Sequence, residues 1–143
     1  MPTRRSDDHI GNHNFKVEIV GVTQAAFMDV EGLESKTVVV EFSDGDSICV
    51  RKRPGLNSCS NIILKRGFIN TDELWNWRKK VIDGMVERKD GSIIICDDSG
   101  IEIMRYNFFE AWPCRWSLSA LRANESKDLV EEIELAVERI ERG

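Results

Sequence analysis

Alternation of apolar and polar residues predicts strands in the first third of the chain. In residues 15–19, three apolar side chains alternate with Lys16 and Glu18, and Gly21 follows. A period of two places one set of side chains on one face, so this segment is expected to be a strand with one buried face. Residues 37–42 repeat the pattern and predict a second strand.

A hairpin is predicted after this second strand. Asp44 and Gly45 separate residues 37–42 from a short apolar run at 48–50. Asp-Gly favours a tight hairpin turn because the turn needs a positive φ, which glycine adopts at little cost. Residues 51–60 (RKRPGLNSCS) are rich in turn formers and are expected to form an exposed arm or loop, with a turn at Pro54-Gly55.

Helical periodicity appears once with clear boundaries, over about residues 71–83. Asn70 is the predicted N-cap, with Glu73 completing a capping box, and Gly84 is the predicted stop. Apolar residues recur at helical spacing and predict one buried stripe. The stripe consists of Leu74, Trp77, Val81 and Ile82.

The second half of the chain alternates less regularly. Residues 93–95 are three isoleucines, as expected of a strand covered on both faces, and residues 97–100 (DDSG) predict a turn. In residues 101–109 the alternation slips by one position at Met104, which indicates a bulge or two buried faces. Residues 129–140 fit either a strand or a helix.

Composition narrows the function classes. The 143 residues are 41% hydrophobic with a net charge of −5, so one domain, residues 14–143, is expected, with a surface that on average repels phosphate. Residues 1–13 are polar and predict a flexible tail. The tail holds His9 and His13, whose spacing would suit a metal only on a helix.

Candidate catalytic chemistry is sparse. Asp97 and Asp98 could serve a carboxylate hydrolase, but they fall in a turn motif in which aspartate binds its own backbone. The four cysteines form no CxxC pair, which favours reduced thiols. We therefore expect no enzyme activity, no cofactor and no metal.

Basic residues beside aromatic residues suggest nucleic-acid binding as an alternative function. Residues 61–77 (NIILKRGFINTDELWNW) combine Lys65 and Arg66 with two tryptophans, and residues 108–116 hold Trp112 and Trp116. Such aromatics can stack on single-stranded bases. On an acidic chain, a core or a subunit interface is the preferred interpretation.

Short segments in order along residues 14–141 carry a family resemblance. They are FKVEI (15–19), GVTQAAF (21–27), GLES (32–35), VRK (50–52), PGL (54–56), NI (61–62), LKRG (64–67), DELWNW (72–77), VIDG (81–84), RK (88–89), GSI (91–93), NF (107–108), AWP (111–113) and ELA (134–136). The series resembles the inner-tube proteins of contractile tails, in phages and in extracellular injection particles. It departs from them at Arg53, where an apolar residue is expected, at Val137, where histidine is common, and over residues 117–127.

The resemblance implies a mainly β fold: an antiparallel β-sandwich or barrel with one flanking helix and a long hairpin arm at about 42–60. It also implies that residues 129–140 are mainly strand. Six subunits would form a ring whose strands jointly line a lumen, and the arm would reach a neighbouring ring. The residues implied for the arm are Phe42, Asp44, Asp46, Arg51, Lys52, Arg53 and Leu56. Leu74, Trp77 and Val81 would pack the helix, and Trp112 and Trp116 are possible interface aromatics.

The implied partners are other copies of the chain, a surrounding sheath protein, baseplate and terminator proteins at the ends, and cargo in the lumen. Specific nucleic-acid recognition is not implied, and a target membrane would be pierced only by the whole assembly. Synthesis and assembly are expected in the cytoplasm. Glu131, Glu132, Glu134 and Glu138 predict an acidic lumen or outer wall. The alternatives are a terminator or baseplate-hub paralogue and a nucleic-acid-binding β-barrel.

Overall fold

A computed structural model describes residues 10–22, 27–46, 48–68, 71–124 and 126–143. The elements along the described chain are β1 (Phe15–Ile19), β2 (Phe27–Glu31), β3 (Ser35–Phe42), β4 (Arg51–Cys59), β5 (Ile62–Gly67), α1 (Glu73–Ile82), β6 (Lys89–Cys96), β7 (Glu102–Leu118), β8 (Val130–Ala136) and β9 (Arg139–Arg142). The ambiguous segment at 129–140 is therefore mainly strand, as the resemblance implies.

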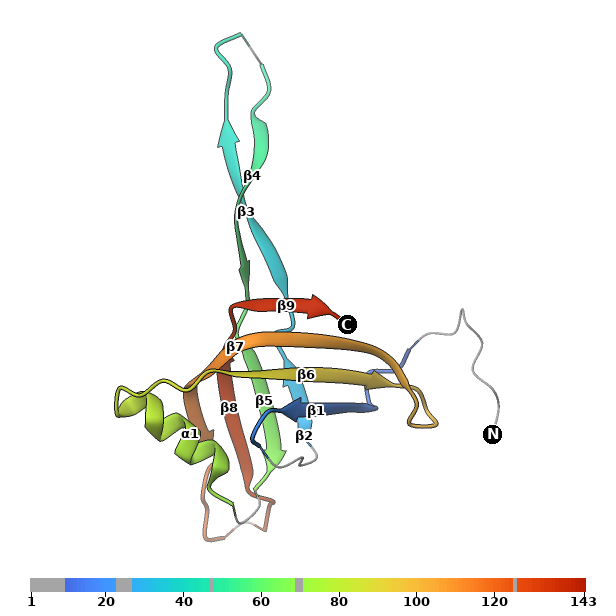
Figure 1. Ribbon diagram of the computed structural model, residues 1–143, viewed down its shortest axis with the longest axis vertical. Coiled ribbons are helices and arrows are strands. Elements are labelled where there is room, and N and C mark those ends of the chain that lie inside the picture. The colour runs from blue at the N-terminus through green and yellow to red at the C-terminus, as the bar shows by residue number, and fades with distance from the viewer. Residues whose placement is uncertain (1–9, 23–26, 47, 69–70, 125) are drawn as a thin grey trace.

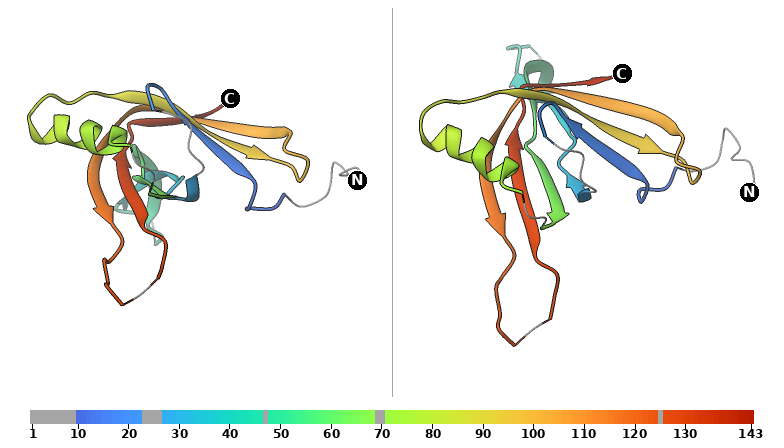
Figure 2. Two further views of the ribbon diagram at one scale, coloured as in Figure 1. Left: turned by 90° about the horizontal axis from the view of Figure 1, so that it is seen from below. Right: turned by 60° about the horizontal axis from the view of Figure 1, so that its bottom comes forward.

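The body of the protein consists of two antiparallel sheets that share β7 (Figure 1). The first half of β7 pairs with β6 and β9, and β6 pairs with β1. The second half pairs with β8, which continues through β5 to β2. Figure 2 shows β7 bending from one sheet into the other. The predicted antiparallel β-sandwich or barrel with one helix is thus confirmed.

Two local features let β7 serve both sheets. Ile95 pairs with Met104 while Cys96 pairs with Glu102, so the bulge predicted from the phase slip lies at Ile103. Glu110 has a φ of 56°, just before pairing passes from β6 to β8. A bulge and a left-handed residue both increase local bending.

A hydrophobic core fills the space between the sheets and α1. Its buried members are Val17, Ile19, Phe27, Ile62, Leu64, Leu74, Trp77, Ile93, Phe108, Ala111, Ile133, Leu135 and Val137. The alternation predicted for residues 15–19 is confirmed, because Val17 and Ile19 are buried while Lys16 is exposed. Val137, a departure from the family, packs in this core.

The helix differs from its prediction at both ends. It begins at Glu73, with Asp72 as an N-cap whose side chain makes no capping hydrogen bond, two residues later than the predicted cap. Asn70 lies outside the described residues. Ile82 is 58% exposed, because the helix ends there and Gly84 turns the chain at a φ of 82°. The buried stripe therefore stops short of Ile82.

The arm is longer than predicted. β3 and β4 pair only with each other among the described strands and span residues 35–59, instead of about 42–60 (Figure 1). Residues 51–59 form a strand, so the turn predicted at Pro54-Gly55 is wrong. Pro54 pairs with Val39 just beyond a register shift, where a residue without an N–H is tolerated. The hairpin predicted from Asp44-Gly45 is confirmed, but residues 43–50 connect β3 and β4, so the connection is longer than the two-residue turn expected.

Candidate functional site

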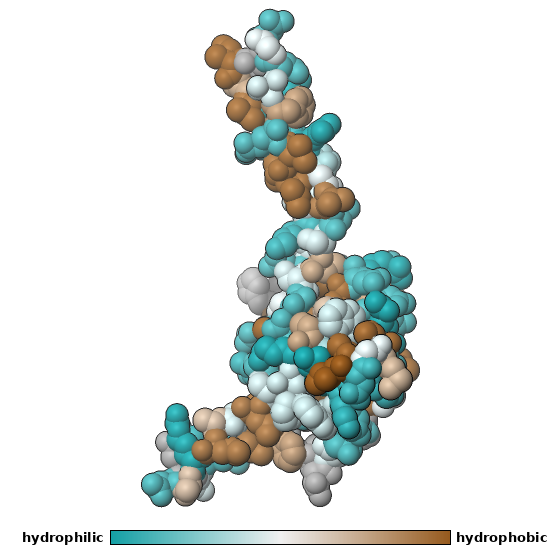
Figure 3. All heavy atoms as spheres, turned by 90° about the vertical axis from the view of Figure 1, so that its left-hand side faces the viewer, coloured by the Kyte–Doolittle hydropathy of each residue, from teal (hydrophilic) through white to brown (hydrophobic). Residues whose placement is uncertain are grey.

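The arm exposes apolar side chains along most of its length. Phe42 pairs with Arg51 and Val40 with Arg53, so these residues share one face of the hairpin. A two-stranded hairpin has no second layer to cover either face. The exposed apolar residues are Val38, Val39, Phe42, Ile48, Val50 and Leu56. Figure 3 shows apolar surface repeated along the projecting arm.

Charged side chains flank these apolar positions. Arg51 Nε lies 3.3 Å from Asp44 Oδ2, and the Arg53 guanidinium lies 5.7 Å from the centre of the Phe42 ring. Arg53, the departure from the family pattern, thus covers part of an aromatic face. Lys52 and Asp46 are exposed. The arm therefore offers an apolar surface with basic residues where β4 leaves the loop and acidic residues in the loop itself.

The outer face of the second sheet carries a network of ion pairs. Lys65 Nζ lies 3.5 Å from Glu132, and Arg115 reaches both Glu132 (2.8 Å) and Glu134 (3.2 Å). The hydrogen bond from Arg115 is the main cause that holds the pKa of Glu132 below its usual value. For Glu134, the amide of Asn61 is the main cause of a lowered pKa. These acids therefore stay ionised and partly neutralised.

The inner face of the same sheet buries a second ion pair. Arg66 is 0% exposed and Glu131 is 1% exposed. Arg66 Nε donates to Glu131 Oε1 (3.0 Å), and Trp116 Nε1 donates to Oε2 (2.9 Å). The Arg66 guanidinium also lies 5.6 Å from the centre of the Phe27 ring. The expectation that Glu131 contributes to an acidic surface is wrong.

The alternation along the two strands could have located this buried pair from the sequence. Arg66 shares its face with Ile62 and Leu64, and Glu131 shares its face with Ile133 and Leu135, all of which are buried. Extending the apolar alternation by one step on each strand reaches the two charges. Opposite charges at the inward positions of two strands were therefore the available signal.

The basic and aromatic residues of 61–77 do not form a nucleic-acid surface. Arg66 is buried against Glu131, and Lys65 is paired with Glu132. Trp77 is buried, and its Nε1 donates to the carbonyl of Glu87 (2.7 Å). Trp75 remains partly exposed and packs on Trp116, with 4.9 Å between ring centres.

The predicted helix-packing and interface positions differ in their exposure. Leu74 is buried, whereas Val81, Trp112 and Trp116 are partly exposed. Helix α1 packs against β7. Leu56 lies on β4 and is 81% exposed. The structure thus separates the predicted residues into an exposed arm and a helix packed on the body.

Asp97 acts as a turn residue. Its Oδ1 accepts hydrogen bonds from the backbone N–H groups of Ser99 and Ile101, both at 2.9 Å. Asp98 lies 3.4 Å from His13 Nε2, and His9 lies outside the described residues. In the described part of the chain, no cluster of three or more His, Cys, Asp or Glu residues could hold a metal.

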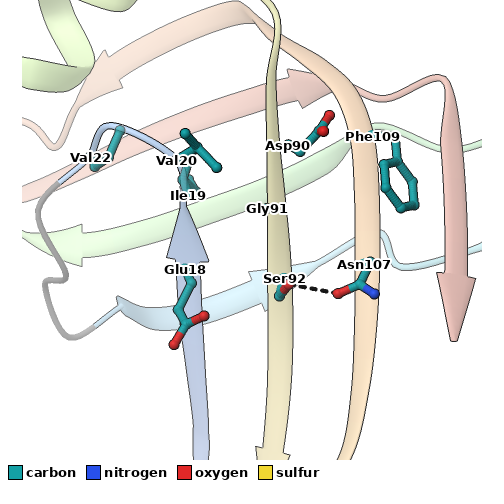
Figure 4. Close-up of a pocket in the computed structure, with 9 residues that line it drawn as sticks. All are labelled: Glu18, Ile19, Val20, Val22, Asp90, Gly91, Ser92, Asn107 and Phe109. Carbon is teal, nitrogen blue, oxygen red and sulfur yellow. Dashed lines mark hydrogen bonds between the residues drawn. The ribbon is translucent and has the colours of Figure 1, made fainter. Parts of the chain in front are cut away.

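A shallow hollow lies over the first sheet, between β1, β6 and β7 (Figure 4). Its volume is about 430 Å³. Both acids at its edge are engaged: Glu18 pairs with Arg105 (3.6 Å), and Asp90 Oδ1 accepts from the N–H of Glu110 (3.0 Å). Ser92 donates to Asn107 (2.7 Å), as Figure 4 shows. These contacts hold the strands together.

All four cysteines carry thiols; Cys96 is buried and Cys49 is exposed. Burial is the main cause that raises the pKa of Cys114, which disfavours its thiolate. Among the described residues, no helix is both long and apolar enough to cross a membrane.

Comparison with known proteins decides the family. A model of the T4-like virus tail tube protein gp19 family matches residues 11–141. The chain belongs to this family. A search of curated proteins finds no match. The family consists of structural tail tube proteins, which agrees with the resemblance seen in the sequence.

Solved structures agree over nearly the whole length of this tail tube protein. A chain of the PVC sheath-tube complex, an extracellular contractile injection system in its extended state, is 28% identical with a TM-score of 0.86, covering 96% of this chain and 93% of that chain. A chain of the PVC sheath/tube terminator is also 28% identical with a TM-score of 0.86, covering 97% and 99%. Hcp1 from Flavobacterium johnsoniae is 19% identical with a TM-score of 0.60 over 90% and 94%, which shows a shared fold.

Proposed function

We propose that this tail tube protein is the repeating subunit of the inner tube of a contractile tail or injection particle. Six copies form a ring, rings stack into a hollow tube, and a lumen carries DNA or other cargo. The observation that carries the proposal is the arm: a chain of this family projects a hairpin whose apolar side chains its own body leaves exposed. Exposed apolar surface of this kind marks a protein interface.

Open sheet edges support ring formation. Of the described strands, β1 and β2 end the main sheet order, and β9 pairs only with β7. An edge strand presents unpaired N–H and C=O groups that readily pair with another chain. A head-to-tail contact that closes by rotation makes a ring, and a closed ring of sheets uses these edges.

The proposed partners follow from the family and its relatives. The similar PVC chains belong to a sheath-tube complex and to a sheath/tube terminator. By analogy, this chain is surrounded by a sheath whose contraction drives the tube through a target envelope, with baseplate and terminator proteins at its ends. The subunit has no catalytic role in this account, because the sheath performs the work. Synthesis and assembly take place in the cytoplasm.

The outer face of the second sheet is a candidate lumen surface with an acidic balance. The strand pairing places Asp29 and Glu31 near Lys65 on this face, and it places Glu132 and Glu134 near Arg115. A net negative wall would not bind DNA in transit. A reconstruction of the tube with a basic lumen would overturn this part of the proposal.

The test of the proposed function is the mass of the purified protein in solution. Sedimentation should detect hexamers and larger species that grow with concentration. Adding the particle's baseplate or initiator proteins should increase the large species further. A protein that stays strictly monomeric at high concentration, even with these components, would contradict the proposal.

A tube-end paralogue is the second candidate. The PVC sheath/tube terminator chain is as similar to this chain as the chain from the sheath-tube complex, by identity and by TM-score. A terminator would form single rings that bind a tube end without adding further rings. Microscopy separates the two candidates, because only a tube subunit grows into long tubes by itself.

A further inference from the structure

An apolar hollow lies at the end of the body opposite the arm. Figure 1 places the arm at one end of the long axis, and the β7–β8 connection and the start of α1 at the other. The hollow has a volume of about 310 Å³. Its lining includes Phe68, Asp72, Trp75, Trp116, Leu118 and Glu131.

The hollow is built from three converging segments. The N–H of Phe68 donates to the carbonyl of Leu129 (2.8 Å), which joins the β5–α1 connection to the start of β8. Trp75, in the first turn of α1, packs against Trp116 of β7 at 4.9 Å between ring centres. Trp116 is oriented by its hydrogen bond to the buried Glu131 (2.9 Å). The aromatic wall is therefore fixed before any partner arrives.

Buried polar atoms without hydrogen-bond partners lie at this hollow and behind it. Thr71, which also lines the hollow, has a buried Oγ1 without a hydrogen-bond partner in the described structure. Behind Glu131, both terminal nitrogens of Arg66 are likewise buried without one. Buried polar groups are nearly always paired, so Thr71 Oγ1 can take a backbone group of a docked loop or a water molecule as its partner, whereas Arg66 is closed off from the hollow.

We propose that this hollow receives the arm loop of a second copy of the chain, in the next ring of the proposed tube. The occupant is the apolar tip formed by Phe42, Ile48 and Val50, all of them exposed. The two surfaces lie at opposite ends of the long axis, so one head-to-tail contact can repeat indefinitely. This inference rests on the proposed stacking and adds the receiving site.

Charge supports the same pairing. The hollow carries Asp72 at its exposed rim, and the first residues after the arm loop are Arg51, Lys52 and Arg53. Opposite charges around an apolar contact favour one orientation and speed the encounter. Arg51 pairs with Asp44 of the loop (3.3 Å). A copy docked by its arm tip would therefore bring Lys52 and Arg53 toward Asp72, with Asp46 as the one further acid of the loop.

The test uses the exposed Cys49 of the arm loop as one end of a crosslink. Phe68→Cys supplies the other end at the hollow, and Met85→Cys, beyond the far end of α1, is the matched control on an exposed apolar residue. Assembled protein is treated with a short bismaleimide and separated by denaturing electrophoresis. Each subunit offers one arm and one hollow, so Phe68→Cys should give a ladder extending beyond the dimer. Met85→Cys should give none, and Cys49→Ser should abolish the ladder.

The outcomes separate the docking from the proposed function. Tubes that form without a Phe68→Cys ladder, or with an equal Met85→Cys ladder, would overturn the docking and leave the tube function standing. Wild-type protein that never assembles would overturn both. If Phe68→Cys does not stack, Leu118→Cys on the opposite wall repeats the test. Loss of stacking in both hollow variants, with rings retained and the Met85→Cys tubes intact, would also support the docking.

Discussion

The body and the arm of this tail tube protein are built from the same strand-forming residues but are stabilised differently. In the body, two sheets and a helix enclose a core, and even a charged pair, Arg66 and Glu131, is fully buried. In the arm, two strands pair only with each other, and Leu56 and Ile48 lie in the open. The body therefore has a core of its own, whereas the arm has none and, under the proposed function, is covered by another copy.

The largest effect on the body is expected from Glu131→Ala. It leaves the Arg66 guanidinium buried without its carboxylate, which costs about 3–5 kcal/mol of unfolding free energy. The measurement is urea unfolding, in an Ile48→Asp parent at a concentration without assembly. The double variant Arg66→Met, Glu131→Leu should recover most of the loss, because it removes both charges. A single variant as stable as its parent would show that the pair is not buried as described.

Two leucine-to-alanine substitutions, one in the body and one in the arm, should give the next largest difference in unfolding free energy. Leu135→Ala removes a side chain that is 0% exposed and should cost about 2–5 kcal/mol. Leu56→Ala, at 81% exposure, should change subunit stability by less than about 0.5 kcal/mol. Both are measured by the same urea unfolding. Equal losses at the two sites would mean that the arm has a core of its own.

The smallest effect concerns the ion pairs on the outer face of the body. The folded-state pKa values of Glu132 and Glu134 lie below the ordinary value of 4.5, so their stabilisation is present above that pH and is lost as the pH falls through the lowered values. Arg115→Met should flatten this acid dependence, by less than about 1 kcal/mol per pair because the pairs are partly exposed. Thermal unfolding followed from neutral pH downward checks it. An unchanged acid profile would exclude Arg115 as the cause.

Sequence reasoning recovered the elements with regular patterns. The alternation at 15–19 and the phase slip near Met104 are local signals, and both correspond to features of the structure. Residues 129–140 could not be assigned by pattern, because short amphipathic segments fit both periods. Only the family resemblance favoured strand. Long-range strand pairing supplied what the local pattern lacked.

The failures have specific physical causes. Turn formers at 51–60 predicted an exposed arm or loop with a turn at Pro54-Gly55. The arm is present, but the pairing of β3 with β4 overrides the local turn preference, and Pro54 is accommodated beside a register shift. The buried Arg66 and Glu131 were missed because composition treats charges as surface residues. The hollow beside Trp75 and Trp116 could not be predicted, since it forms where three separate segments meet.

The most direct test of the central claim is electron microscopy of two proteins in parallel. One is the wild type, and the other replaces arm-loop residues 43–50 with a short glycine-rich turn. We predict long tubes of stacked hexameric rings for the wild type, and isolated rings or single subunits for the variant, because its body folds but its rings lack the apolar loop that joins them. Tubes of equal length from both proteins would contradict the claim that the arm is completed by another copy, and the absence of rings or tubes from the wild type would contradict the account as a whole.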